Sequence, residues 1–494
     1  MNFLKHFFNF FSYKEDFSNR EKIIFLGIFS IVTSLVLFNH EMWRDEIQAW
    51  LLARDSSNIL NLLNNLKYEG HTPLWHLLLF PLTKFQLSIS SMQFLSWIIG
   101  VLTALIILFI SPFGRLEKIL FIFGYYFFYE YVILSRNYGI SLLLLFLSLH
   151  FFSNKKIFLS SIFLSFAALC NVFSLILSSV LGLYFLYKTK FNKIFNVPFI
   201  ASIVLYFCTL IFCFLLLYPP EDRAFGLTSN NFVLDLDRFF VVGYKIAHAF
   251  FPYTSISFDY LSWNIWSLNP LIASSMFLFS LSFLYRLFCL SNLSFILLTL
   301  VALLFFIFQY TIYPASSLRH SGIFFGAYII FYWISFLEQK PKLNLINSSI
   351  YKINSKIYFS SLVLSFLLAT YALTSDYFYK FSNSKDAAIY LLKDLNLNDG
   401  EEVFVDGSSE GSSVIGYANF NKAFYRQGLR YGSFNKWDKS RLNEGNFSTI
   451  NLSSFQVLLL SYELVEIPDD FEFTAKFNEK NSVNESFYIY RRKP

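Results

Sequence analysis

Long apolar stretches separated by short polar segments run through the first three quarters of the chain. A helix that crosses a bilayer needs about 20 mostly apolar residues, because backbone groups left without partners in lipid are costly. Eleven stretches qualify, some of them barely, and the stretch from 157 to 187 is divided in two at Cys170 and Asn171. They are 22–39, 91–111, 118–134, 137–153, 157–169, 171–187, 197–218, 267–287, 293–313, 321–337 and 357–375. The pattern predicts an all-α polytopic membrane body over residues 1–375.

One further apolar segment, Pro73 to Phe85, is predicted not to cross the membrane. Pro73 caps its start, and Lys84 near its end has a stem long enough to carry its charge into the headgroup region. We expect a helix that lies in the membrane interface.

From residue 376 onward the pattern becomes that of a soluble domain. Lys385 to Leu395 has the spacing of an amphipathic helix, whereas Glu402 to Asp406, Phe455 to Ser461 and Phe487 to Tyr490 read as strands. Residues 376–494 are therefore predicted to form a small α/β domain outside the bilayer.

The composition supports this division. Of the 494 residues, 55% are hydrophobic and 15% charged, against about 45–50% and 25% in soluble domains, which excludes a simple soluble enzyme. The four cysteines all lie in apolar stretches and indicate neither a disulfide framework nor a zinc site. We predict no cofactor and no metal site, and leave a divalent cation open as an alternative. No basic block indicates nucleic-acid binding.

The positions of Lys and Arg predict the orientation, because cytoplasmic loops are enriched in them. Eleven crossings place every basic cluster on one side, and the loops 40–90 and 219–266 with the C-terminal domain on the other. We therefore expect a multi-pass protein of the bacterial inner or plasma membrane, with a cytoplasmic N-terminus and an extracytoplasmic C-terminal domain. The basic clusters are the N-terminal residues Lys5 to Lys22, then Arg115 and Lys118, Lys155 and Lys156, Lys188 to Lys193, Arg286, and Lys340 to Lys356.

The first outer loop holds the most informative residues. Asp45 and Glu46 are adjacent acids directly after the first crossing, where charge at the membrane surface is costly. Trp43, Trp50 and Trp75 suggest a partly dry shell around them. A carboxylate in such a shell is a candidate general base, while a solvated loop whose acids cap a helix is the open alternative.

This loop resembles a known family of membrane enzymes. An Asp-Glu pair after the first crossing, followed by His71-Thr72-Pro73-Leu74 at the start of an interfacial helix, is similar to the first outer loop of the GT-C glycosyltransferases. The similarity is greatest to protein O-mannosyltransferases, lipid A aminoarabinose transferases and related bacterial enzymes. It covers residues 40–75 and departs from the pattern in having one proline where relatives often have two. It implies a multi-span fold, a polyprenyl-phosphate-linked sugar donor and an extracytoplasmic active site.

The resemblance implies roles for particular residues. Asp45 matches the acid that acts as general base, and Glu46 is either a second catalytic acid or structural support. Arg44, Glu69 and Tyr138 are assigned supporting places in the site.

Cations for the donor's phosphate are implied at three places. His71 precedes the proline motif, Arg136 lies in the Ser-Arg-Asn-Tyr turn between the third and fourth crossings, and Arg319 and His320 lie between the ninth and tenth. The arginines, with His71 or His320 protonated, are expected to stabilise the departing phosphate. The alternative is that these arginines have no role in binding and only extend their charges from helix ends to the membrane surface. Against this, both lie on the outer side, where Lys and Arg are normally depleted.

The predicted function is that of a hexosyl or pentosyl transferase of the cell envelope. A sugar passes from a polyprenyl phosphate to a hydroxyl of a glycolipid, polysaccharide or protein acceptor, with inversion. The alternatives are a transporter or flippase of lipid-linked sugars, or an assembly protein whose tail is a binding module. Charges concentrated at the outer ends of the crossings, rather than at their centres, favour the transferase.

Overall fold

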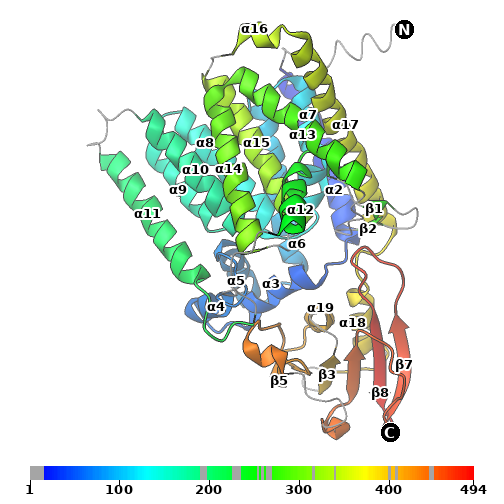
Figure 1. Cartoon of the computed structure of the whole chain (residues 1–494). Coiled ribbons are helices and arrows are strands. Elements are labelled where there is room, and N and C mark those ends of the chain that lie inside the picture. The colour runs from blue at the N-terminus through cyan, green and yellow to red at the C-terminus, as the bar shows by residue number, and fades with distance from the viewer. Residues whose placement is uncertain are drawn as a thin grey trace, which may run out of the picture.

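The computed structural model describes residues 16–189, 197–224, 235–252, 255–256, 261–262, 270–313, 317–338, 341–398, 402–406, 410–443 and 450–494. A bundle of long helices forms the body, and a smaller domain with a β-sheet lies at one end of it (Figure 1). The start of the first described helix, α2 (Asn19–Asn39), lies at the opposite end of the bundle.

The long helices follow the apolar stretches closely. Within the described residues, six are long and apolar enough to cross a membrane: α2 (Asn19–Asn39), α6 (Ser90–Phe109), α11 (Val197–Leu217), α14 (Asn292–Thr311), α15 (Leu318–Glu338) and α17 (Ser349–Phe378). Shorter or partly described apolar helices are α8 (Asn137–Ser153), α9 (Ile157–Ala168), α10 (Val172–Lys188) and α13 (Pro270–Leu290). The chain is thus built as an integral membrane protein, while the predicted count of eleven crossings is not confirmed.

The predicted crossing 118–134 is not one helix. The chain forms α7 (Arg115–Ile122), then a π-helix, η1 (Tyr126–Glu130), and then turns. Ser365 of α17 lies in the gap: its hydroxyl accepts a hydrogen bond from the Tyr125 N–H at 3.0 Å. A Cβ on Gly124 would lie 3.2 Å from the same oxygen, so α17 packs tightly against the break.

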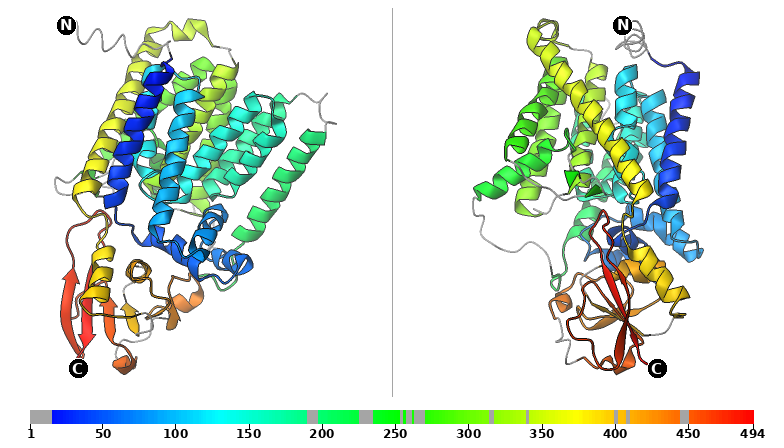
Figure 2. Two further views of the ribbon diagram at one scale, coloured as in Figure 1. Left: turned by 180° about the vertical axis from the view of Figure 1, so that it is seen from behind. Right: turned by 90° about the vertical axis from the view of Figure 1, so that its right-hand side faces the viewer.

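Three short helices of the first outer loop lie across the end of the bundle, next to the C-terminal domain (Figures 1 and 2). They are α3 (Arg44–Asp55), α4 (Ile59–Leu66) and α5 (Leu74–Lys84), the last at the predicted interfacial segment. Lys84 near the end of α5 is exposed. Its ammonium donates to the main-chain oxygens of Arg54 and Ser56, both at 2.7 Å, because the last carbonyls of a helix need donors.

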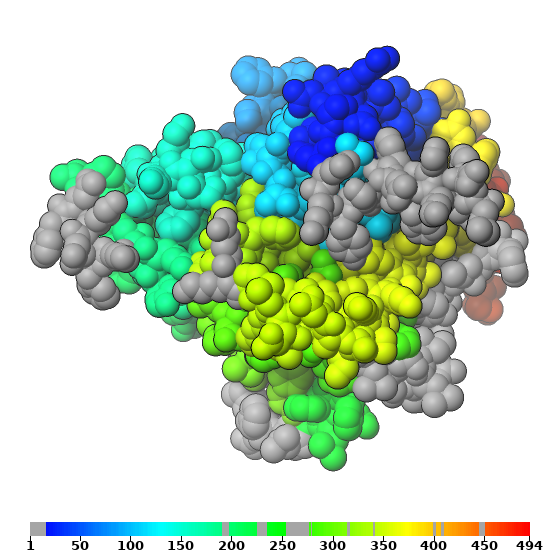
Figure 3. All heavy atoms as spheres, turned by 90° about the horizontal axis from the view of Figure 1, so that it is seen from above, coloured from blue at the N-terminus to red at the C-terminus, as the bar shows by residue number. Residues whose placement is uncertain are grey.

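Basic residues gather at the end of the bundle away from the sheet domain. Lys22 and Lys118 both bind Asp16, at 2.6 and 2.7 Å. Seen from this end, α2 (blue) lies beside cyan atoms of the early helices, with α16 (Leu343–Ile346) and the start of α17 (yellow-green) across the face (Figure 3). Arg286 lies toward this same end: it is buried in α13, binds Glu117 of α7 at 3.0 Å, and donates to Tyr351 and Ser355 near the start of α17. Lys5, Lys14, Lys190, Lys193 and Lys340 lie outside the described residues.

The C-terminal domain has a six-stranded mixed sheet in the order β5-β4-β3-β6-β8-β7. β3 is parallel to β4 and β6, and the other pairs are antiparallel. The predicted strands and helix are present. The elements are α18 (Ser384–Lys393), β3 (Val403–Asp406), α19 (Gly411–Tyr417), β4 (Ala423–Tyr425), β5 (Arg430–Gly432), β6 (Val457–Leu460), β7 (Phe471–Phe477) and β8 (Phe487–Arg492).

Helix α3 is enclosed between the body and the C-terminal domain. Its eight consecutive residues 46–53 are all buried, which is more than two helical turns and therefore covers every face. On the domain side, α19 lies so close that a Cβ on Gly416 would be 2.2 Å from Cγ2 of Ile47. Arg44 binds Glu410 of the domain at 2.8 Å.

The remaining described elements are small and lie away from α3. They are α12 (Leu236–Ala247), the two-residue strands β1 (Ser255–Ile256) and β2 (Leu261–Ser262), and 3-10 turns at Lys439–Leu442 and Leu452–Ser454.

Candidate active site

Asp45 lies in the first turn of α3 between two arginines. Its Oδ2 is 2.9 Å from Nη2 of Arg319 and 3.8 Å from Nη1 of Arg136. Arg136 also donates to the main-chain oxygen of Asp45. The three predicted residues are far apart in sequence, and the fold brings them together.

Two helix N-termini position these arginines. Arg136 is the residue before the first turn of α8, in an extended conformation, and Arg319 is in the first turn of α15. Helix N-termini carry partial positive charge from their N–H groups, so both helices and both guanidinium groups make this place favourable for an anion.

The arginines keep Asp45 ionised. Burial raises the pKa of this carboxyl, but the charges of Arg319, Arg136 and Arg44 outweigh burial and hold the pKa below its ordinary value. Asp45 is therefore a carboxylate at neutral pH, and a weak proton acceptor for as long as the arginines hold it.

A small cavity adjoins Asp45, with a volume of about 20 Å³, enough for roughly one water molecule. Three buried polar atoms of its lining, Nε1 of Trp75, Nδ1 of His76 and Oδ1 of Asn137, make no hydrogen bond to the described residues. The cavity therefore offers polar groups to a guest. Its lining residues are Asp45, Gln48, Ala49, Glu69, His71, Trp75, His76, Arg136 and Asn137.

His71 lies in this cavity, and its surroundings favour the neutral imidazole while no phosphate is bound. Burial, with Arg136 and Arg319 nearby, lowers the pKa of His71 to about 3. Burial also lowers the pKa of His76, the next histidine of the lining, to about 3. Either imidazole can donate one hydrogen bond, but neither brings a positive charge.

His320 does not line the cavity. Its Nδ1 accepts the N–H of Ser317 at 2.9 Å, so this nitrogen carries no proton and the ring is neutral. Its Nε2 then donates to the hydroxyl of Tyr138 at 3.0 Å. The fold brings these two predicted residues together as a buried pair next to Arg319.

Glu46 is fully buried and faces away from the cavity. Its Oε1 accepts the N–H of Ser135 at 2.7 Å, and its Oε2 is 3.2 Å from Nε2 of His40. Nδ1 of His40 is 2.8 Å from Asp376 at the end of α17. Of the two predicted roles for Glu46, this geometry fits structural support.

We call His40, Glu46 and Asp376 the buried triad. Burial lowers the pKa of His40, but its two carboxylate neighbours outweigh burial and raise the pKa to about 10, so the imidazole is charged. Glu46 follows Asp45, and Ser135 precedes Arg136, so the triad sets the position of one site residue relative to another. Sequence reasoning missed His40 and Asp376, which are 336 positions apart.

The remaining predicted residues divide between the cavity and the domain contact. Glu69 lines the cavity, where its Oε1 accepts a hydrogen bond from Nε2 of Gln48 at 2.7 Å. Arg44 points to Glu410 in the C-terminal domain and does not line the cavity. Within the described residues, no three His, Cys, Asp or Glu side chains are grouped so that they could hold a metal ion.

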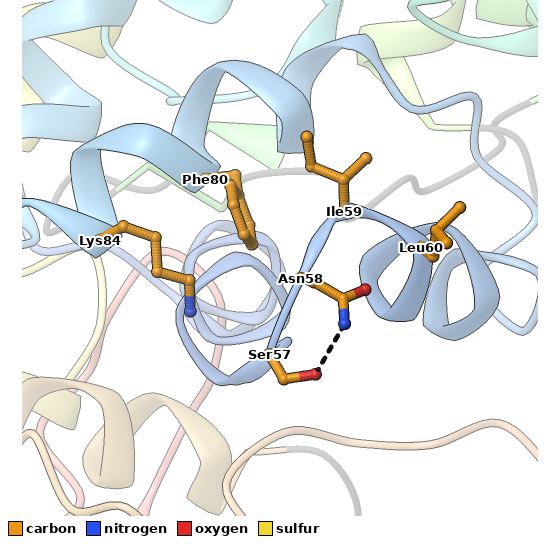
Figure 4. A pocket seen from close by; sticks show the side chains of 6 residues that line it. All are labelled: Ser57, Asn58, Ile59, Leu60, Phe80 and Lys84. Carbon is orange, nitrogen blue, oxygen red and sulfur yellow. Dashed lines mark hydrogen bonds between the residues drawn. The ribbon is translucent and has the colours of Figure 1, made fainter.

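A second, wider hollow lies between α4 and α5 (Figure 4). Its volume is about 510 Å³, and it shares no lining residue with the Asp45 cavity. Lys84 lies over the ring of Phe80, with 4.9 Å between its ammonium and the ring centre. The hollow is lined by Ser57, Asn58, Ile59, Leu60, Phe80 and Lys84.

No family model and no curated protein matches the chain. Among solved structures, it is similar to ArnT from Cupriavidus metallidurans bound to undecaprenyl phosphate, with 10% identity over 94% of this chain and 97% of that one, at a TM-score of 0.53. It also matches the arabinofuranosyltransferase AftD from Mycobacteria, with 11% identity over 98% of this chain and 40% of that one, at a TM-score of 0.47. The first match confirms the predicted GT-C fold.

Proposed function

We propose that this protein transfers a sugar from a polyprenyl-phosphate donor to a hydroxyl of an acceptor. The observation that carries the proposal is Asp45 held between Arg136, which precedes the apolar helix α8, and Arg319, in the first turn of the membrane-length helix α15. A carboxylate and two cations at the ends of apolar helices suit a donor that is anchored in lipid. The ArnT structure, which has this fold, was solved with undecaprenyl phosphate bound, and this supports a donor of that class.

Arg136 and Arg319 would bind the donor's phosphate. Guanidinium groups hold phosphate oxygens through paired, charge-assisted hydrogen bonds. As the bond between sugar and phosphate breaks, negative charge grows on the leaving phosphate, and fixed cations stabilise it there. His71 adds a neutral hydrogen-bond donor from the same cavity.

Asp45 would act as general base. The acceptor oxygen attacks the anomeric carbon, its proton passes to Asp45, and the phosphate leaves with the bonding electron pair. One displacement inverts the anomeric centre. Because a bound phosphate shares the arginines, it weakens their hold on Asp45 and raises the pKa of this carboxyl, so the base becomes effective only when donor is present.

The reaction would take place on the outer face of the membrane. The basic residues of the opposite end fit a cytoplasmic side by the charge bias of membrane proteins. The acceptor is then a glycolipid, polysaccharide or protein of the cell envelope.

Transfer of label from a panel of polyprenyl-phosphate sugars, in membranes that hold the acceptor, tests the proposal. Asp45→Asn should slow transfer at least about 100-fold, whereas Asp237→Asn, an exposed carboxylate in the first turn of α12, should leave it unchanged. Transfer that persists in Asp45→Asn would remove Asp45 as base. If no donor reacts, even in membranes from the native source, a transporter or flippase of lipid-linked sugars becomes the better interpretation.

A further inference from the structure

We infer that Glu69 binds a second hydroxyl of the acceptor, next to the one that Asp45 deprotonates, and that the C-terminal domain holds Glu69 in place through Gln48. The inference rests on the proposed function and deepens it by naming the acceptor's chemistry. The acceptor is polyhydroxylated, like a sugar residue, and not a simple alcohol.

The position of Glu69 is fixed by a chain of hydrogen bonds. The main-chain N–H of Asn435 donates to Oε1 of Gln48 at 2.9 Å. A main-chain N–H can only donate, so the Gln48 oxygen must face it. The amide NH₂ group of Gln48 then donates to the Asn435 oxygen and to Oε1 of Glu69, both at 2.7 Å. Gln48 is therefore a positioning residue for Glu69.

The two carboxylates of the cavity differ in their contacts with cations. Arg136 and Arg319 bind Asp45, whereas Glu69 forms no ion pair with any described residue, although it lines the same cavity. A phosphate is attracted to the arginines and repelled by Glu69. A hydroxyl has the opposite preference, because a carboxylate accepts its hydrogen bond. The cavity has room for about one hydroxyl group beside Glu69, while the partly exposed Asp45 takes the proton of another hydroxyl of the same molecule.

The ionisation of Glu69 suits this role. Burial, with a smaller contribution from the charge of Asp45, raises its pKa to about 7, against the hydrogen bond from Gln48 and the charges of Arg136 and Arg223, which lower it. Above that pH Glu69 is a carboxylate and accepts a hydroxyl proton in a hydrogen bond. Binding of the acceptor should therefore strengthen as the pH rises through about 7.

The C-terminal domain contacts Gln48 of the cavity lining by its segment 433–438. Asn435 is anchored there, since its side-chain amide donates to the hydroxyl of Ser412 in α19 at 3.1 Å. The outer loop before residue 225 pairs with the same segment, as the Ala224 N–H donates to the Trp437 oxygen at 2.9 Å.

The first part of the test measures binding of undecaprenyl phosphate to the purified full chain in detergent. Arg319→Ala should weaken binding at least about tenfold, whereas Glu69→Gln should leave it unchanged or tighter, because a negative charge is removed. Glu41→Gln is the matched control: burial and Asp386 raise the pKa of this carboxyl to about 7 as well, but it does not line the cavity. Equal weakening by Glu69→Gln and Arg319→Ala would place Glu69 in the donor site and overturn the inference.

The second part compares glycerol with methanol as acceptors for the donor that the panel identifies. Methanol has only the attacking hydroxyl, so Glu69→Gln should lower the ratio of glycerol to methanol products by about tenfold while cleavage of the donor continues. Gln48→Glu keeps the bond from Asn435 but repels Glu69, and should move the pH midpoint of glycerol transfer above about 7. An unchanged ratio, or an unmoved midpoint, would overturn the inference. Absence of donor cleavage in the wild type would instead count against the proposed function.

Discussion

The charged imidazole of the buried triad should make stability depend on pH in the alkaline range. The pKa of His40 rises from 6.5 to about 10 in the folded chain. At about 1.4 kcal/mol for each pH unit, this corresponds to at most roughly 5 kcal/mol of stabilisation. The folded pKa is the higher one, so this stabilisation is complete below about pH 6.5 and is lost as the pH rises through about 10.

His40→Gln removes the charge and leaves two buried carboxylates without their cation. Removing one partner of a buried ion pair costs about 3–5 kcal/mol, so we expect a loss of that size at pH 6.5. The difference from the wild type should narrow toward pH 10, where the wild-type imidazole also loses its proton. Both values are free energies of unfolding, measured by denaturant titration in detergent at several pH values.

His150→Gln controls for the loss of an ordinary histidine, because His150 lies at the far end of α8 beside Asn154 and outside the triad. A wild-type stability that stays flat between pH 6.5 and 10 would refute the charged imidazole. A difference in unfolding free energy between wild type and His40→Gln that does not narrow toward pH 10 would also refute it. In that case a neutral His40 that shares protons with Glu46 and Asp376 would describe the triad better.

Three further predictions concern other parts of the molecule. Arg319→Ala should slow sugar transfer more than tenfold in the panel assay, and full activity would remove this residue from the site. Gly416→Val should loosen the C-terminal domain and speed its proteolysis, because the new side chain would clash with Ile47 of α3. Gly243→Ala, where a Cβ meets nothing within 4 Å, should not; equal digestion of the two variants would contradict the close packing. Reporter fusions after Arg115 and after Pro494 should report cytoplasm and exterior, and the same side for both would overturn the orientation.

The helices were predictable because their signal is local. A long apolar stretch bounded by polar residues needs no knowledge of its neighbours, and ten of the eleven predicted crossings coincide with helices within the described residues. The break at Gly124 was not predictable, since it depends on Ser365 of a helix more than 200 positions later.

The site could be predicted in part. Arg136 and Arg319 stood out because arginine is unexpected on the outer side, and the resemblance supplied Asp45. The neutral state of His71 depends on burial that only the folded chain reveals. No local pattern announces the contact of His40 with Asp376, or of Gln48 with Asn435, because each joins segments more than 300 positions apart.

The enclosure of α3 has a consequence for how such proteins diversify. Ile47 and Leu51 are 0% exposed, and a Cβ on Gly416 of the C-terminal domain would lie within 4 Å of both. Deleting that domain would therefore expose an apolar face of the helix that carries Asp45. The two parts cannot be exchanged independently between homologues. A chimaera with a new domain would need α3 from the same parent, and substitutions at this contact should arise in pairs over evolutionary time.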